Sequence, residues 1–203
     1  MNKARFEAFS DGVFAFAITL LALGFVLPDL RSPTNRELTS ALVHLWPNLI
    51  AYGLSFSVIG LLWQNHHALF RCVQHVDRRT VFWNLQLLAG TVLIPFATTT
   101  LGSYPTRSPS TFLYGCVLSI CATFFNLMFA HLARSGAFAR DVSPEAIAST
   151  LRAYWIGWFV YVGATLIALV LPIVSFGAYL ALVVYFLIPR GADSATPLSA
   201  RQW

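Results

Sequence analysis

The chain has 203 residues, of which 57% are hydrophobic and only 10% are charged, and its mean hydropathy is +0.67. Soluble domains carry about 25% charged residues, so a soluble core of this composition would lack the polar surface to cover it. The apolar residues form blocks of about 20, which is the length of a helix that crosses a bilayer. These values exclude a soluble globular domain and predict a polytopic membrane protein.

Three cysteines and a formal net charge of +5 exclude two further classes. Cys116 and Cys121 lie in one apolar segment and no C-x-x-C pair is present, so neither a disulfide framework nor a zinc site is expected. The basic residues are scattered through short loops, which is typical of membrane orientation rather than of nucleic-acid binding. We therefore expect no nucleic-acid partner, no metal site and no cofactor.

Apolar runs between charged residues and Pro or Gly predict six transmembrane helices. They are expected at residues 4–27, 38–65, 80–101, 111–132, 146–171 and 173–189. Leu171 and Pro172 alone separate the last two, which favours a tight hairpin and leaves one long kinked helix as the alternative. The fold class is then an all-α membrane protein, with one membrane domain over residues 1–190 and a polar tail over residues 191–203.

The distribution of Lys and Arg predicts the orientation. An even number of spans puts both termini on one side of the membrane, and loops on the cytoplasmic side carry an excess of basic residues. The opposite loops hold Arg31, Arg36 and Arg107. The side of the termini holds Lys3, Arg5, Arg71, Arg78, Arg79, Arg134, Arg140, Arg152, Arg190 and Arg201. We therefore expect a multi-pass protein of the cell membrane with both termini in the cytoplasm.

The first helix has two distinct faces. It is expected to stay in the mature protein, because a signal peptide would not carry Glu7 and Asp11 in its apolar run. At about 100° per residue, one face is bulky with a single hydroxyl, and the far side is small with one carboxylate. The small side is expected to let neighbouring helices approach closely. The bulky face comprises Phe9, Gly12, Phe16, Thr19, Leu20, Leu23 and Leu27, and the far side comprises Asp11, Ala15, Ile18 and Ala22.

Asp11 is a carboxylate at membrane depth, which is costly unless it is paired. In the predicted topology the second helix ends, and the third begins, at the depth of Ser10 and Asp11. We therefore expect an inner polar network that joins the first three helices. A cluster at the membrane interface that contacts lipid headgroups is the alternative. The partners offered by the second and third helices are Trp63, Gln64, Asn65, His66, His67, Trp83 and Asn84.

A motif in the first helix resembles a known family. The segments R-x-x-x-F-S-D-G (residues 5–12), V-F-A (13–15) and I-T-L-L (18–21) strongly resemble the opening of prokaryotic members of the transmembrane protein 175 family of potassium channels. The segment W-x-x-H-H-x-x-F (63–70) is similar to the end of that family's second helix, and the chain length agrees. The resemblance implies a homotetramer in which four copies of the first helix surround a central pore for passively permeating potassium.

The resemblance also implies roles for single residues. Large apolar side chains narrow the pore, and their counterparts are Phe16, Leu20 and Leu23, with the Thr19 hydroxyl beside the narrowest layer. The same four residues lie on the bulky face obtained from helical periodicity. The resemblance also implies that four residues belong to the inter-helix network: Arg5, Phe9, Ser10 and Asp11.

Two positions depart from the family pattern. Phe16 is aromatic where the family usually has a branched aliphatic residue, so four rings would either close the pore more tightly or rotate and leave it open. Gly24 stands where an acidic residue is expected at the outer mouth, and Asp29 is the nearest substitute.

Residues 98–104, T-T-T-L-G-S-Y, faintly resemble a carbonyl-lined potassium filter. They lack the second filter glycine and a preceding pore helix. We interpret them as the outer end of a helix followed by a turn at Tyr104 and Pro105.

Two other functions compete with a channel. An enzyme is not expected, because His66 and His67 point about 100° apart on a helix and no G-x-S-x-G motif is present. A proton-coupled transporter, or a proton leak through Asp11 and His66 or His67, is the stronger alternative. No internal repeat or broken-helix pair supports it. His44 and His131 are interpreted as interfacial.

Overall fold

The computed structural model describes residues 2–30 and 32–187, and in these ranges the chain is helical apart from its loops and one isolated β-bridge. This confirms the all-α fold class. The polar tail predicted for residues 191–203 lies outside the described residues. In chain order the elements are α1 (Lys3–Leu20), the 3-10 helix η1 (Leu21–Gly24), α2 (Asn35–His44), α3 (Trp46–Arg71), α4 (Arg78–Ser103), α5 (Ser108–Arg134), α6 (Pro144–Ile167) and α7 (Pro172–Leu187).

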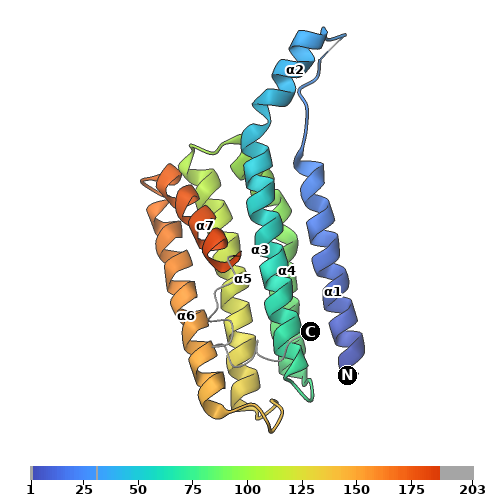
Figure 1. Cartoon of the computed structure of the whole chain (residues 1–203), viewed down its shortest axis with the longest axis vertical. Coiled ribbons are helices and arrows are strands. Elements are labelled where there is room, and N and C mark those ends of the chain that lie inside the picture. The colour runs from blue at the N-terminus through green and yellow to red at the C-terminus, as the bar shows by residue number, and fades with distance from the viewer. Residues whose placement is uncertain (1, 31, 188–203) are drawn as a thin grey trace.

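The long helices α1, α3, α4, α5 and α6 lie side by side, with α1 at one edge and α6 at the other (Figure 1). α1 packs against α3 and α4, and α4 packs against α5, which in turn packs against α6. The shorter α7 turns back after α6 and contacts α3, α5 and α6. The tight hairpin predicted at Leu171 and Pro172 is therefore confirmed.

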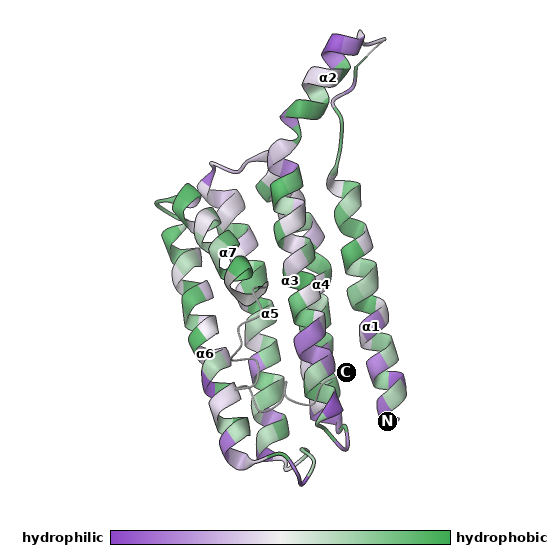
Figure 2. Cartoon of the chain, viewed as in Figure 1, coloured by the Kyte–Doolittle hydropathy of each residue, from purple (hydrophilic) through white to green (hydrophobic). Residues whose placement is uncertain are grey.

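Within the described residues, four segments are long and apolar enough to cross a membrane: Lys3–Gly24, α3, α4 and α5. α7 has 16 residues, fewer than the roughly 20 that a perpendicular span requires, and α6 is not among the four. Figure 2 shows that hydrophilic residues gather near the N-terminal end of α1 and along the same end of the bundle on α3. α1 and α3 thus bring hydrophilic residues to a common level.

The helix predicted at residues 38–65 is in fact two helices, α2 and α3, which meet at Leu45. α2 begins with a capping box: the Glu37 carboxylate accepts from the Thr34 N–H at 2.8 Å, and the Glu37 N–H donates to the Thr34 hydroxyl at 3.3 Å. Pro47 lies in the first turn of α3 and has no N–H, so one hydrogen-bonded ladder cannot run through it. As a result α2 projects beyond the bundle (Figure 1).

The loops at residues 72–77 and 135–143 are hydrogen-bonded to each other. The Gln74 N–H donates to the Ala137 carbonyl at 2.9 Å, and the Ala139 N–H donates to the Cys72 carbonyl at 2.8 Å. In the second loop Gly136 adopts a φ of +65°, which a residue without a Cβ reaches at little cost. These bonds join the α3–α4 turn to the α5–α6 turn.

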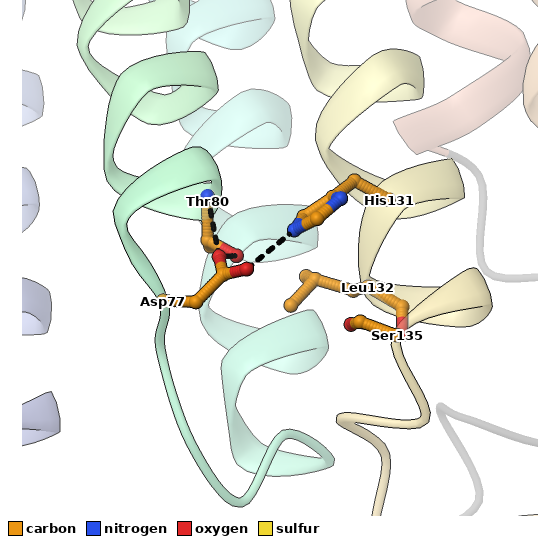
Figure 3. A network of polar contacts seen from close by, with 5 residues as sticks. All are labelled: Asp77, Thr80, His131, Leu132 and Ser135. Atoms are coloured by element: carbon orange, nitrogen blue, oxygen red, sulfur yellow. Dashed lines mark hydrogen bonds and ion pairs between the residues drawn. The ribbon is translucent and has the colours of Figure 1, made fainter.

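Asp77 links the α3–α4 turn to the last turn of α5 (Figure 3). One carboxylate oxygen accepts from the Thr80 N–H and the Thr80 hydroxyl, both at 2.7 Å, and thereby caps α4. The other oxygen accepts from His131 Nε2 at 2.8 Å. Partial burial opposes ionisation, but these hydrogen bonds outweigh it and lower the pKa of Asp77 to about 2. His131, predicted as interfacial, is thus a specific partner of Asp77.

Close approaches between small residues hold α4 against α5. A Cβ placed at Gly90 would lie 2.9 Å from the Cys121 sulfur, so no larger residue fits there without a shift. Cys72 and Cys121 are buried and Cys116 is half-buried, and none of the three, all of which the structure describes, forms a disulfide. This agrees with the absence of a disulfide framework in the sequence.

Residues 98–103 are the last turns of α4, and so form a helix end, as predicted, and not a filter loop. The Thr98 hydroxyl donates to Ser55 Oγ at 2.7 Å, and Ser55 Oγ lies 2.9 Å from the Tyr114 hydroxyl. All three side chains are buried. The hydroxyl of Thr98 is therefore part of a chain of hydrogen bonds that joins α3, α4 and α5.

Candidate functional site

α1 buries one stripe of its surface against α3 and α4. The stripe follows the spacing of a helix face, in steps of three or four residues. It includes two phenylalanines that are each 1% exposed, Phe6 and Phe14. The complete buried stripe is Phe6, Ser10, Phe14, Ala17 and Leu21.

The expectation that the small-residue side of α1 packs against its neighbours is wrong. Ala15 and Ala22 are exposed, and Asp11 and Ile18 are only half-buried. The bulky phenylalanines of the buried stripe fill the space between α1 and its neighbours, and Ser10 supplies the hydrogen bond. Packed phenylalanine side chains and one hydrogen bond therefore hold α1 against α3 and α4, rather than a close approach of small residues.

The face of α1 predicted to line a pore is uncovered in the single chain. Phe9, Phe16 and Leu23 are 56%, 58% and 73% exposed, whereas the opposite stripe is buried. Thr19 is exposed and Leu20 is half-buried. Leu23 lies in the 3-10 turn η1, where each residue advances by about 120° instead of 100°, so it does not continue the α-helical stripe exactly as periodicity predicted.

The Thr19 hydroxyl is oriented by its own helix. It donates to the Phe16 carbonyl at 2.8 Å. A hydroxyl has one donor and two acceptor lone pairs, so this bond uses the donor and leaves the oxygen available on the exposed face. The arrangement offers an electron-rich oxygen, which suits a cation rather than an anion.

A buried chain of hydrogen bonds joins α1, α4 and α3. Asn84 Nδ2 donates to Ser10 Oγ at 2.9 Å, and the Ser10 hydroxyl donates to the Phe6 carbonyl at 3.0 Å. His66 Nε2 lies 2.9 Å from Asn84 Oδ1, and with the amide in this orientation His66 is the donor. All three polar side chains are at most 1% exposed, so each bond is made away from lipid and water.

Aromatic rings enclose His66. Its ring centroid lies 4.6 Å from that of Phe70, 5.4 Å from that of Phe14 and 6.1 Å from that of Phe6. The sequence interpretation missed Phe6 and Phe14 as parts of this site. The spacing Phe6, Ser10, Phe14 would have placed both on the face of the predicted Ser10 contact.

Asp11 and Trp63 form a second contact between α1 and α3. Trp63 Nε1 donates to Asp11 Oδ1 at 2.9 Å, and the Trp63 ring stacks on the His67 ring with centroids 5.9 Å apart. Trp63 is 38% exposed, so this pair lies nearer the protein surface than the Asn84 chain. In the described residues no bond connects Asp11 to His66 or His67.

Three predicted members of the inner network lie outside these contacts. Arg5, Phe9 and Asn65 are exposed, and within the described ranges they make no hydrogen bond, ion pair or ring contact. Ser10, Asp11, Trp63, His66 and Asn84 are the residues that the structure brings together through hydrogen bonds, with His67 stacked beside them. We call these six residues the inner network.

Gly24, the last residue of η1, packs against Thr99 of α4. A Cβ at this position would lie 2.6 Å from the Thr99 hydroxyl oxygen, so a side chain here requires that hydroxyl to move. The acidic residue expected here by the family pattern would therefore displace the Thr99 hydroxyl. Asp29 is exposed beyond the end of η1.

The described residues include no group of three or more His, Cys, Asp or Glu side chains that could hold a metal ion. The exposed face of α1 is apolar and carries one hydroxyl, and the inner network lies on the side of α1 that packs against α3 and α4. Apolar constrictions of this kind occur in ion channels.

Comparison with known proteins supports this assessment. The model of the family described as endosomal/lysosomal potassium channel TMEM175 matches residues 5–95. A potassium channel of Chamaesiphon minutus is 32% identical over 195 residues, which cover 94% of this chain and 96% of that protein. The endosomal/lysosomal proton channel TMEM175 of Homo sapiens is 34% identical over 136 residues, or 63% of this chain and 27% of that protein.

A solved structure agrees along almost the whole chain. The crystal structure of a lysosomal potassium-selective channel TMEM175 homolog from Chamaesiphon minutus superposes with a TM-score of 0.81 at 31% identity. The superposition covers 91% of this chain and 95% of that one. Near-complete coverage in both sequence and structure, together with the motif on α1, shows that this chain belongs to the TMEM175 family of channels.

Proposed function

We propose that four copies of this chain form a potassium-selective channel with the four α1 helices around a central pore. The observation that carries the proposal is the uncovered apolar face of α1, on which Phe9 and Phe16 are more than half exposed while Phe6 and Phe14 are buried. The potassium channel names of the bacterial relative and of the solved homolog supply the permeant ion. No cofactor takes part in this passive conduction.

One chain cannot enclose a pore with α1 alone. α1 lies at an edge of the bundle and packs against α3 and α4, which leaves its other side uncovered (Figure 1). Closed rings of identical subunits are the usual way to cover such a face. Four copies then supply four identical stripes to a shared axis.

In this assembly α6 and α7 also lie in the bilayer, which gives six spans with both termini in the cytoplasm. Support comes from the exposed apolar side chains of α6, among them Ile156, Phe159 and Val160, which suit contact with lipid tails. The uneven distribution of Arg supports the orientation. The protein then resides in the cell membrane, and its partners are its own copies, lipid and monovalent cations.

The pore narrows at Phe16 and continues past Thr19, Leu20 and Leu23. Apolar rings narrower than a hydrated ion force partial dehydration and resist wetting, so they control both closure and discrimination. The Thr19 oxygen replaces part of the lost hydration beside the Phe16 layer. Discrimination against the more strongly hydrated sodium follows.

The test uses purified protein in liposomes. Potassium flux is driven by voltage alone, and sodium replaces potassium in a parallel experiment. Phe16→Ala removes most of four rings, so it should raise flux several-fold and weaken the preference for potassium.

Phe159→Ala is the matched control. Phe159 is 65% exposed on α6, at the opposite edge of the bundle and at a similar distance along its helix from the inner end. It should change neither quantity. If Phe16→Ala behaves like Phe159→Ala, α1 does not line the pore.

Proton permeation is a second candidate, since the Homo sapiens relative is named a proton channel. Asp11 and His67 flank Trp63 and lie on the exposed side of the inner network. A pH-sensitive dye inside liposomes, with the voltage clamped by a potassium carrier, measures this flux. Proton flux that disappears in Asp11→Asn while potassium flux remains would assign the proton path to the inner network.

A further inference from the structure

Phe9 occupies the same exposed face as Phe16 but has no part in the inner network. It is 56% exposed, against 58% for Phe16. The two are seven residues apart, which is about two helical turns or 10.5 Å along the axis, and their directions differ by only about 20°. Phe9 is therefore a second large ring on the pore-facing stripe, nearer the inner end of α1.

The two residues that follow Phe9 are both bonded to other helices. Ser10 accepts from Asn84 on α4 at 2.9 Å, and Asp11 accepts from Trp63 on α3 at 2.9 Å. Two bonds in different directions fix both the height and the rotation of this turn of α1. Phe9 is consequently held away from α3 and α4.

Gly12 separates the two rings. It lies one turn above Phe9 on the exposed face, and a Cβ there would meet nothing within 4 Å in the single chain. A stripe that reads Phe9, Gly12, Phe16 alternates wide and narrow levels. In a ring of four copies, the level of Gly12 is wide and the levels of the two phenylalanines are narrow.

We propose that four Phe9 side chains form a second constriction at the inner mouth of the pore, and that the inner network is the frame that holds them there. This inference rests on the proposed assembly around α1. Phe9 faces the path of the permeant ion. Ser10, Asp11, Trp63 and Asn84 are positioning residues that fix the direction of Phe9. The F-S-D order of the motif then has a physical meaning: one residue faces the pore and the next two fix its direction.

Liposome flux provides the first test, with Phe82 as the matched control. Phe82 is 53% exposed on α4, two residues from Asn84, and lies about 160° around that helix from the bond to Ser10. Phe9→Ala should raise cation flux several-fold, and Phe82→Ala should leave it unchanged. Phe9→Leu, which keeps an apolar side chain and fits the same helix, should give a smaller rise.

Reagent access provides the second test. A cationic thiol reagent added from the inner side should modify Phe9→Cys and alter flux, because this position faces water in the pore. On Phe82→Cys, which is also exposed near the inner end, the reagent should leave flux unchanged because Phe82 lies off the pore-facing stripe. The native background is low, since Cys72 and Cys121 are buried and Cys116 is half-buried.

The positioning role predicts coupling between two substitutions. Trp63→Phe keeps an aromatic ring but removes the N–H that donates a hydrogen bond to Asp11. It should raise flux in the wild-type background and have no further effect in Phe9→Ala, because no ring remains to be positioned. Independent effects of the two substitutions would overturn the positioning role.

The outcomes separate this inference from the proposed function. If Phe16→Ala raises flux while Phe9→Ala and the thiol reagent on Phe9→Cys do nothing, the second constriction is wrong and the pore stands. If neither Phe16 nor Phe9 substitutions alter flux, the assembly around α1 is wrong and this inference falls with it.

Discussion

Phe14 and Phe16 are two positions apart in α1 and have opposite environments. Phe14 is 1% exposed and packs against the His66 ring, whereas Phe16 is 58% exposed. Truncating a buried phenylalanine costs about 3–5 kcal/mol, so a Phe14 variant reports on folding before it reports on permeation. Identical residue types therefore serve as core and as candidate pore surface within one helical turn.

Thr19→Val tests the hydroxyl on the exposed face. Valine keeps the shape of threonine and removes the oxygen, so the potassium-to-sodium permeability ratio should fall while total flux changes little. Reversal potentials under bi-ionic conditions measure the ratio. Thr100→Val is the control, because its hydroxyl is bonded in a similar way, to the Phe96 carbonyl at 3.0 Å, on α4. An unchanged ratio in Thr19→Val would remove the hydroxyl from the selectivity mechanism.

Asp11→Ala tests whether the carboxylate supports folding or lines the pore. The substitution leaves the Trp63 N–H without its acceptor, and an unsatisfied buried donor costs about 1–3 kcal/mol. Because Trp63 is 38% exposed, the loss of stability should lie at the lower end. Asp11→Asn keeps an acceptor oxygen and should be milder. Chromatography of heated samples measures the assembled fraction; normal assembly with altered ion selectivity would instead make Asp11 a pore ligand.

Depth in the membrane predicted which polar residues share a level, but not which of them pair. The need of Asp11 for a partner pointed to the ends of α3 and α4, where Trp63, His66 and Asn84 are found. The pairing of Asp11 with Trp63, and of His66 with Asn84, depends on the rotation of each helix about its axis. Hydropathy does not specify that rotation when Phe residues occur on both sides of α1.

At the scale of helices, the apolar runs predicted where the long helices lie better than they predicted where a helix breaks. Only His44 interrupts the apolar residues from Leu42 to Trp46, so the apolar pattern predicts one helix across α2 and α3. Pro47 carried the missing signal, because it fits the first turn of a helix and not its interior. The change from α1 to η1 at Leu21 has no comparable sequence mark and arises where Gly24 packs against Thr99.

The cap of α4 predicts a dependence of stability on pH. Asp77 has a pKa of about 2 in the folded chain, below the ordinary value of 3.8, so the folded state favours its charged form. This contribution is complete above about pH 4 and is lost as the pH falls toward 2. Asp77→Ala, which removes the cap, should lower the free energy of unfolding by about 1 kcal/mol at neutral pH.

Thermal unfolding in detergent across pH 2–7 measures the effect. The difference between the wild type and Asp77→Asn, which keeps a capping oxygen without the charge, should be full near about pH 4–5 and shrink as the pH falls toward 2. A difference that stays constant down to pH 2 would show that the charge of Asp77 does not stabilise the fold.

At the scale of the whole molecule, the assembly predicts a specific cross-linking pattern. Lys3 is the single lysine in the sequence, and it lies at the inner end of α1 beside Glu7, 3.5 Å away. An amine-reactive cross-linker therefore reports the proximity of α1 ends. In native-like membranes it should give a ladder that stops at four chains, and Lys3→Arg should weaken it. A ladder that stops at two, or a monomer that still conducts, contradicts the shared pore.

The bonds of α1 also set an order for the making of each protomer. Ser10 and Asn84 are 74 residues apart, and Asp11 and Trp63 are 52 apart. At about 5–20 residues per second, roughly 4–15 s of synthesis separate Ser10 from its partner. During that interval the Ser10 hydroxyl can bond only to the Phe6 carbonyl of its own helix, and Asp11 has no Trp63 partner until 52 residues have followed it. Docking of α1 thus follows the insertion of α4, and a nascent chain that stalls before Asn84 cannot complete a subunit.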